Sequence, residues 1–196
     1  IRPRIAPYLD AAALKLYNAG LHADHLTWLG LAFGGFAGFF LIYKMYLTAL
    51  VFIALNRICD GLDGPIARID KNGPTNMGAY IDIVFDFIVY AGIPFCMATG
   101  LDTKSTWAAT AFLLFGITFS GTSFLAYAIL AAKQGTRTAK KGFYYVSGLM
   151  EGTETVLFMA LICLMPQFYA VIASVFGILC LMTGVGRIGR ALMDYA

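Results

Sequence analysis

The sequence predicts an all-α integral membrane protein with six transmembrane helices and an N-terminal amphipathic helix at the membrane interface. Of its 196 residues, 60% are hydrophobic and only 13% are charged, and the mean hydropathy is +0.75. Apolar segments of about 20 residues, the length that crosses a bilayer, recur along the chain. We therefore expect a single transmembrane domain over residues 1–196, with a juxtamembrane helix in 1–22 and a six-helix bundle in 26–187.

The amphipathic helix is expected over residues 5–19, where Leu9, Ala13 and Leu16 recur at helical spacing. This stretch is too short to span a bilayer, so we expect it to lie on the membrane interface. An ordinary helix packed against the bundle is the alternative interpretation. The expected spans follow at residues 26–43, 47–68, 78–97, 106–132, 145–165 and 168–185.

Small residues in the first expected span indicate close helix packing. Gly30, Gly34 and Gly38 recur at four-residue steps and therefore share one helix face. A face of glycines lets the backbone of a neighbouring helix approach closely.

Lysine and arginine residues predict the orientation. Of the 14, eleven lie on the side shared by the N-terminus, the second and fourth interhelical loops and the C-terminus. Lys44 and Lys104 lie in loops on the other side, and Arg57 lies within a span. The positive-inside rule then puts both termini in the cytoplasm. No basic run is long enough to indicate nucleic-acid binding, so we expect contacts with membrane lipids and none with nucleic acid.

Four carboxylates stand in segments that are otherwise apolar: Asp60, Asp63, Asp82 and Asp86. Their i,i+3 and i,i+4 spacings place each pair on one helix face, one turn apart. If the two helices are antiparallel neighbours, all four acids converge near the cytoplasmic surface. Acids at membrane depth are costly, and four of them cannot neutralise one another. We expect them to bind two divalent cations, Mg²⁺ or Mn²⁺, at a site that Ca²⁺ could also occupy.

Two such ions would suit displacement at phosphorus, because together they hold the attacking and the leaving oxygen. Gly64 and Ala67 extend the helix face of the first two acids and leave room for a ligand. Arg68 could bind a diphosphate through its guanidinium. As alternatives, the small residues could serve packing, Arg68 could be a topology anchor, and the acids could line a proton or cation pathway.

These residues resemble a known signature. The pattern D-x-x-D-G-x-x-A-R, followed by G-x-x-x-D-x-x-x-D, is similar to that of the CDP-alcohol phosphotransferases. All its fixed positions are present: Asp60, Asp63, Gly64, Ala67, Arg68, Gly78, Asp82 and Asp86. The gap between Arg68 and Gly78 is one residue longer than the usual one and falls in a Gly-Pro loop. The motif covers residues 60–86, and the expected six spans extend the likeness over most of the chain.

The resemblance implies an enzyme that moves the phosphatidyl group of CDP-diacylglycerol onto the hydroxyl of a small polar alcohol and releases CMP. By position, Asp60 and Asp82 would bridge the two metal ions, Asp63 would complete the first site, and Asp86 would complete the second and act as the catalytic base. CDP binding would fall to Asp63, Gly64, Ala67, Arg68, Thr75 and Thr27. A homodimer in a bacterial inner membrane, with its active site facing the cytoplasm, is also expected.

The acceptor is predicted from the basic connection between the fourth and fifth spans. Its cations could bind an anionic alcohol and are Lys133, Arg137, Lys140 and Lys141. Glycerol 3-phosphate is our first expectation, with inositol phosphate, serine or choline as alternatives. As an alternative, these residues could be basic only because a cytoplasmic loop favours positive charge for topology and for contact with anionic lipids. Outside this family, a polyprenyl-transferring enzyme or a cation transporter could also use intramembrane acids.

Overall fold

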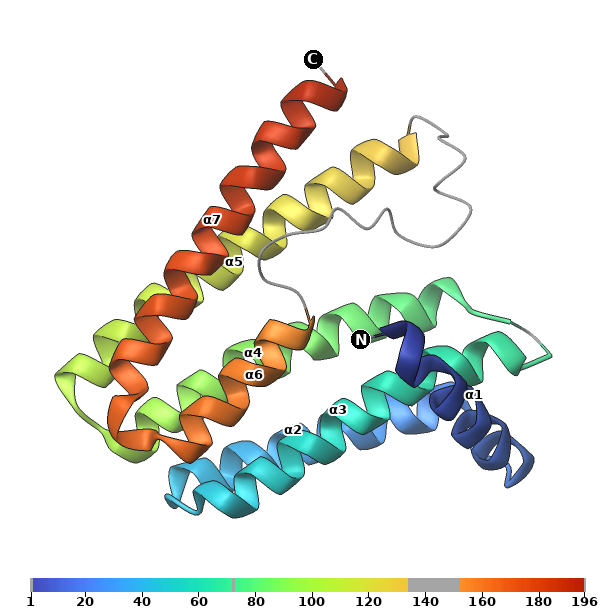
Figure 1. Ribbon diagram of the computed structural model, residues 1–196, viewed down its shortest axis with the longest axis horizontal. Coiled ribbons are helices and arrows are strands. Elements are labelled where there is room, and N and C mark those ends of the chain that lie inside the picture. Colours follow the sequence, from blue (N-terminus) through green and yellow to red (C-terminus); the bar gives the residue numbers. More distant parts are fainter. Residues whose placement is uncertain (1, 72, 134–151, 196) are drawn as a thin grey trace. The chain divides into compact units, whose positions relative to one another are not determined.

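The computed structural model describes residues 2–71, 73–133 and 152–195, which are helical apart from short connections (Figure 1). The chain divides into two compact units, Ile1–Leu101 and Asp102–Ala196. The first unit contains α1 (Arg2–Asn18), α2 (Ala23–Ile42), α3 (Tyr46–Ile69) and α4 (Asn76–Leu101). The second contains α5 (Lys104–Lys133), α6 (Gly152–Leu164), the 3₁₀ turn η2 (Pro166–Phe168) and α7 (Tyr169–Tyr195). The predicted all-helical class is confirmed.

Four helical stretches in the described residues are long and apolar enough to cross a membrane: Ala23–Ile42, Asn76–Leu101, Lys104–Ala132 and Pro166–Tyr195. The predicted second span, α3, has 24 residues but is not among them, because its charged side chains interrupt the apolar run. The predicted fifth span is described only as α6, whose 13 residues are too few to cross. Six spans, and a single domain made of them, therefore stay predictions.

The glycines of α2 bring its backbone close to both α3 and α4. A Cβ atom built on Gly30 would lie 3.2 Å from Cβ of Cys59 on α3, and one on Gly34 would lie 2.7 Å from Cγ2 of Val89 on α4. At Gly38 the same atom would lie 2.8 Å from Sγ of Cys96. The predicted close packing is confirmed. Because α2 packs along both helices, it fixes the positions of α3 and α4 in the first unit (Figure 1).

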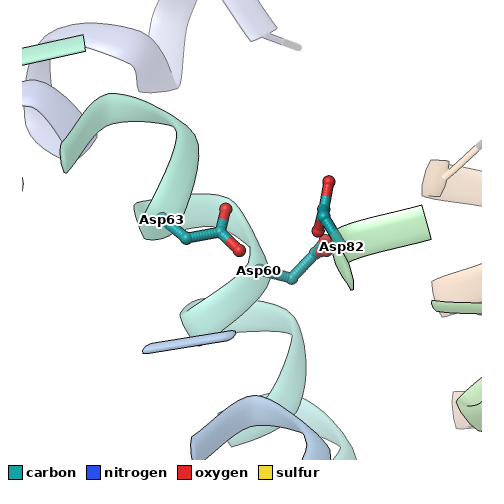
Figure 2. Close-up of side chains that lie close together, drawn as sticks. All are labelled: Asp60, Asp63 and Asp82. Atoms are coloured by element: carbon teal, nitrogen blue, oxygen red, sulfur yellow. The ribbon is translucent and has the colours of Figure 1, made fainter. Parts of the chain in front are cut away.

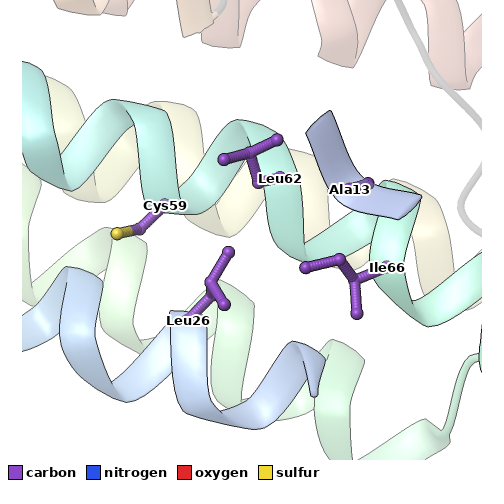
Figure 3. Packing of buried hydrophobic residues seen from close by; sticks show 5 residues of the cluster. All are labelled: Ala13, Leu26, Cys59, Leu62 and Ile66. Atoms are coloured by element: carbon purple, nitrogen blue, oxygen red, sulfur yellow. The ribbon is translucent and has the colours of Figure 1, made fainter. Parts of the chain in front are cut away.

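The N-terminal helix α1 packs on the C-terminal half of α3. Ala13 is fully buried and belongs to a cluster with Leu26 of α2 and with Cys59, Leu62 and Ile66 of α3 (Figure 3). Leu9 and Leu16, two of the residues that predicted the helix, pack around this cluster. The helix and its apolar face are thus observed, and its placement on a membrane interface stays a prediction.

In the second unit, α5 and α7 pack along each other. A Cβ atom on Gly116 would lie 2.7 Å from the carbonyl oxygen of Gly177, so small residues again bring two backbones together. Arg187, on α7, is buried and donates from Nη1 to the carbonyl oxygen and hydroxyl of Ser120, at 3.0 and 3.1 Å. The sixth span was expected to end at residue 185, where the apolar run stops. The helix α7 nevertheless continues to Tyr195, through turns that contain charged side chains.

Candidate metal and nucleotide site

Three of the four predicted acids gather in the first unit. Asp60 and Asp63 extend from α3 toward Asp82 on α4 (Figure 2). One carboxylate oxygen of each lies within 4.8 Å of the others. Asp63 is buried, and the other two are partly exposed. The i,i+3 spacing was expected to place Asp60 and Asp63 on one face of the helix, and both acids do face Asp82 of α4.

The carboxylate of Asp63 is held by two donors. The hydroxyl of Thr27, on α2, lies 3.1 Å from Oδ2 of Asp63 and 3.1 Å from the carbonyl oxygen of Ala23. The backbone N–H of Gly64 donates to the other oxygen, at 2.6 Å. The structure places Thr27 behind a predicted metal ligand, where its hydroxyl orients the carboxylate. Its predicted contact with the nucleotide stays a prediction.

The fourth acid, Asp86, lies beside this group and is engaged in other contacts. Nη2 of Arg57 lies 3.0 Å from its Oδ1, and the hydroxyl of Tyr90 donates to its Oδ2 at 3.0 Å. Nη1 of the same guanidinium lies 3.5 Å from Oδ2 of Asp60. Asp86 was expected to be both a metal ligand and the base, and in this structure its two oxygens accept hydrogen bonds from an arginine and a tyrosine.

Sequence reasoning recognised Arg57 as an intramembrane cation but did not assign it to the site. Its i,i+3 spacing from Asp60 was a usable signal. Its contact with Asp86 was not predictable from spacing, because it depends on how α3 and α4 are rotated about their axes. Tyr90 follows Asp86 by four residues and could have been found as the next side chain on the same helix face.

The space enclosed by these side chains suits a small, hard cation. The pocket has a volume of about 20 Å³ and is lined by the four acids together with Thr27, Asn56, Arg57 and apolar residues. A water molecule needs at least ~10–15 Å³ measured in this way, so the pocket has room for an ion or a water. The lining offers carboxylate, hydroxyl and amide oxygens, which are the donors that Mg²⁺, Mn²⁺ and Ca²⁺ prefer. The residues therefore fit a divalent cation.

The residues predicted to hold CDP lie on the last turns of α3 and just beyond them. Gly64 and Ala67 are partly exposed, and the side chain of Arg68 is 61% exposed. A Cβ atom on Gly64 would lie 3.7 Å from Nη1 of Arg68, so the guanidinium leans back over the glycine. Nη2 of Arg68 also lies 3.4 Å from a carboxylate oxygen of Asp10 on α1, an exposed pair that a stronger anion could replace.

Thr75 has a structural role at the start of α4. Its hydroxyl accepts a hydrogen bond from the backbone N–H of Gly78 at 2.9 Å, as a residue that caps a helix N-terminus does. This contact explains a threonine at this position without a nucleotide, so contact with CDP stays a prediction there.

The basic connection falls largely outside the described residues. Lys133 ends α5, and Arg137, Lys140 and Lys141 lie in the part of the chain that the structure does not describe. Their predicted role in holding the acceptor is untested.

In the first unit, aspartates from two helices line a cation-sized pocket, and the described residues include four helices that could cross a membrane. The family model for CDP-alcohol phosphatidyltransferase matches residues 21–186. The chain belongs to this family of transferases, as its signature residues predicted. The assignment argues against the polyprenyl-transferring enzyme and the cation transporter.

Two relatives extend the comparison. Inner membrane protein YnjF of Escherichia coli is 43% identical over 191 residues, which are 96% of this chain and 91% of the relative. A protein of Aquifex aeolicus is 29% identical over 157 residues, or 77% of this chain and 74% of the relative.

Solved structures share the fold. The phosphatidylinositol phosphate synthase of Mycobacterium tuberculosis with CDP-DAG bound is 18% identical, with a TM-score of 0.71 and 92% of each chain covered. The same enzyme in complex with manganese and citrate gives a TM-score of 0.74 at 18% identity, covering 94% of this chain and 88% of that one. At this identity the likeness establishes the fold.

Proposed function

We propose that this protein transfers the phosphatidyl group of CDP-diacylglycerol to the hydroxyl of a small polar alcohol, with glycerol 3-phosphate as the first candidate, and releases CMP. The observation that carries the proposal is the convergence of Asp60, Asp63 and Asp82, at signature positions of the family, on one cation-sized pocket. The relative that is 43% identical is named as an inner membrane protein. We accordingly place this chain in a bacterial inner membrane with the site facing the cytoplasm, where the donor reaches it from the lipid and the acceptor from water.

We assign the metal ligands from the signature, and the geometry of the acids supports this assignment. Asp60, Asp63 and Asp82 would hold one divalent cation, and Asp86 with Asp60 and Asp82 would hold a second. Bound there, such ions would neutralise the charge of the diphosphate and of the departing CMP. Thr27 and the N–H of Gly64 keep Asp63 in position for this role. The binding of manganese by a protein of the same fold agrees with the donor set.

The chain's own residues then bind the donor and move one proton. Arg68 would leave Asp10 and pair with the diphosphate, while Gly64 and Ala67 leave space for the cytidine part beside α3. Asp86 would take the proton from the acceptor hydroxyl as its oxygen attacks the β-phosphorus. The bond between that phosphorus and the bridging oxygen breaks, and CMP departs with the bonding electron pair.

The test is an assay of CMP release by the purified protein with CDP-diacylglycerol and Mn²⁺ or Mg²⁺. Each acceptor is supplied separately: glycerol 3-phosphate, inositol phosphate, serine, choline or none. We expect metal-dependent CMP formation with one acceptor, together with a lipid product whose mass equals the phosphatidyl group plus that alcohol. If no acceptor on the panel yields CMP above the metal-free control, the proposal fails.

A further inference from the structure

Arg57 places a positive charge among the carboxylates that would hold the metal ions. Its side chain is only 11% exposed, and its guanidinium contacts Asp86 at 3.0 Å and Asp60 at 3.5 Å. In a metal site, a cation so close to the ligands opposes the binding of another cation. The four acids do not by themselves require such a residue, so its presence calls for a role.

We propose that Arg57 is a built-in counter-cation for Asp86. Its contact with Asp60 is the longer of the two, at 3.5 Å against 3.0 Å for Asp86. Arg57 therefore leaves Asp60, together with Asp63 and Asp82, available to one divalent cation, and it withholds Asp86 from a second cation until the donor diphosphate is present. This inference rests on the proposed function and deepens it, because it assigns a positioning residue that orders the filling of the site. The signature of the family does not include this position.

The guanidinium is held in place from several sides. Its Nε donates to the side-chain oxygen of Asn56 at 2.7 Å, and the amide of Asn56 donates to the carbonyl oxygen of Gly30 at 2.8 Å. Asn56 is only 3% exposed, so this anchor to α2 is protected from water. The hydroxyl of Tyr90 lies 3.2 Å from Nη1 and hydrogen-bonds to Asp86 as well. Arg57 is thereby fixed against Asp86 across the gap between α3 and α4.

The formal charges explain why the nucleotide matters. With all groups ionised, four carboxylates and one guanidinium give −4 + 1 = −3. With one divalent cation bound the charge is −1, and with two it is +1. A net positive charge in a partly buried pocket disfavours the second ion. The diphosphate of the donor carries two negative charges, which return the total to −1 and offer Arg57 an alternative anion.

The experiment counts bound Mn²⁺ by titrating the metal-free, full-length protein in detergent and following the electron paramagnetic resonance signal of the free ion. For the wild type we expect one ion per chain without nucleotide and two in the presence of CDP. For Arg57→Gln we expect two ions without nucleotide, with the second bound at least about tenfold more tightly than in the wild type. Arg57→Lys keeps the charge and should bind one ion.

Matched variants assign the effect to charge at Asp86. Tyr90→Phe removes a hydrogen bond to the same carboxylate but no charge, so it should bind one ion like the wild type. The double variant Arg57→Gln/Asp86→Asn should lose the second ion again. A second ion in Tyr90→Phe equal to that in Arg57→Gln would show that competition for the oxygens, and not charge, is what matters, and would overturn the proposal.

The titration of the wild type tests the role of Arg57 even if the Arg57→Gln variant does not fold. Two ions of equal affinity in the absence of nucleotide would contradict the role of Arg57 while leaving the metal site intact. No bound ion under either condition would instead contradict the proposed function itself.

Discussion

Asp63 is the buried member of the acid group, and its carboxylate is oriented by two neighbouring donors. The hydroxyl of Thr27 reaches it from α2, and the N–H of Gly64 reaches it from its own helix. Hydrogen-bond partners of metal ligands set the ligand's orientation and basicity, and losing one typically lowers metal affinity about 10- to 100-fold. The role of Thr27 can therefore be tested apart from any contact with the nucleotide.

Replacing Thr27 by valine keeps the shape of the side chain and removes the hydroxyl. We expect the Mn²⁺ concentration that gives half-maximal CMP release to rise about tenfold, because Asp63 loses a donor that holds its carboxylate. Thr27→Ser keeps the hydroxyl and should stay within about threefold of the wild type. Equal metal requirements for the valine variant and the wild type would contradict this role.

The carboxylate of Asp82 is the contribution of α4 to the group of three. Asp82→Asn should lower CMP release by at least about 100-fold, a larger effect than losing a hydrogen-bond partner of a ligand. The same change removes one of several like charges, so thermal unfolding should occur at the wild-type temperature or above it. A variant that folds and retains more than a tenth of the activity would argue against Asp82 as a metal ligand.

The acid positions were predictable from the sequence, whereas their partners were only partly so. Spacing along one helix is enough to place Asp60 and Asp63 on a common face, and a short loop brings the next helix back to meet them. The pairing of Arg57 with Asp86 depends on side chains from two helices, and a single sequence without an alignment does not contain that relation. The sequence did not reveal that Thr75 caps α4, and its predicted contact with the nucleotide stays a prediction.

At the scale of helices, α2 positions the two helices that carry the acids, because its glycines allow α3 and α4 to pack closely against it. The four-residue glycine spacing made this predictable. The polar last turns of α7 made its end unpredictable, since hydropathy marks where an apolar stretch stops and not where a helix stops. In α3, charged side chains lower the hydropathy within a helix that is continuous for 24 residues. The hydropathy criterion therefore does not identify α3 as a span, although the helix is long enough to be one.

A glycine on α4 tests how tightly these helices are packed. A Cβ atom on Gly100 would lie 2.5 Å from the carbonyl oxygen of Leu41 on α2, a backbone atom that cannot rotate away. Gly100→Ala should therefore lower the thermal unfolding temperature by several degrees, equivalent to about 1–3 kcal/mol of overpacking.

Gly92 provides the matched control on the same helix, because a Cβ atom there has no atom within 4 Å. Gly92→Ala should leave the unfolding temperature unchanged or raise it slightly, as alanine favours a helix over glycine by about 1 kcal/mol. Equal effects of the two substitutions would show that α2 and α4 are not packed as closely as described.

At the scale of the molecule, four helical stretches among the described residues qualify as spans by length and composition. Large apolar side chains remain exposed on them, as expected for contact with lipid. Six spans and a homodimer stay predictions. Composition is enough to predict a membrane protein. The number of spans is harder to predict, because a helix that carries the site's charges fails the same hydropathy criterion that identifies the others.

The charge bias predicts the orientation, which can be measured with reporter fusions in a bacterial host. Green fluorescent protein fused after Ala196 should fluoresce, and alkaline phosphatase at the same place should be inactive, because the C-terminus is expected in the cytoplasm. Alkaline phosphatase fused after Asp102, between α4 and α5, should be active. Active phosphatase at the C-terminus would reverse the topology and place the acids away from the cytoplasm.

In the proposed function, aspartates from α3 and α4 hold a divalent cation between them. The most direct measurement is anomalous X-ray diffraction from crystals of the protein grown with Mn²⁺. We expect an anomalous peak in contact with carboxylate oxygens of Asp60, Asp63 and Asp82. Crystals saturated with Mn²⁺ that show no peak among these three side chains, or that show the side chains turned away from one another, would contradict it.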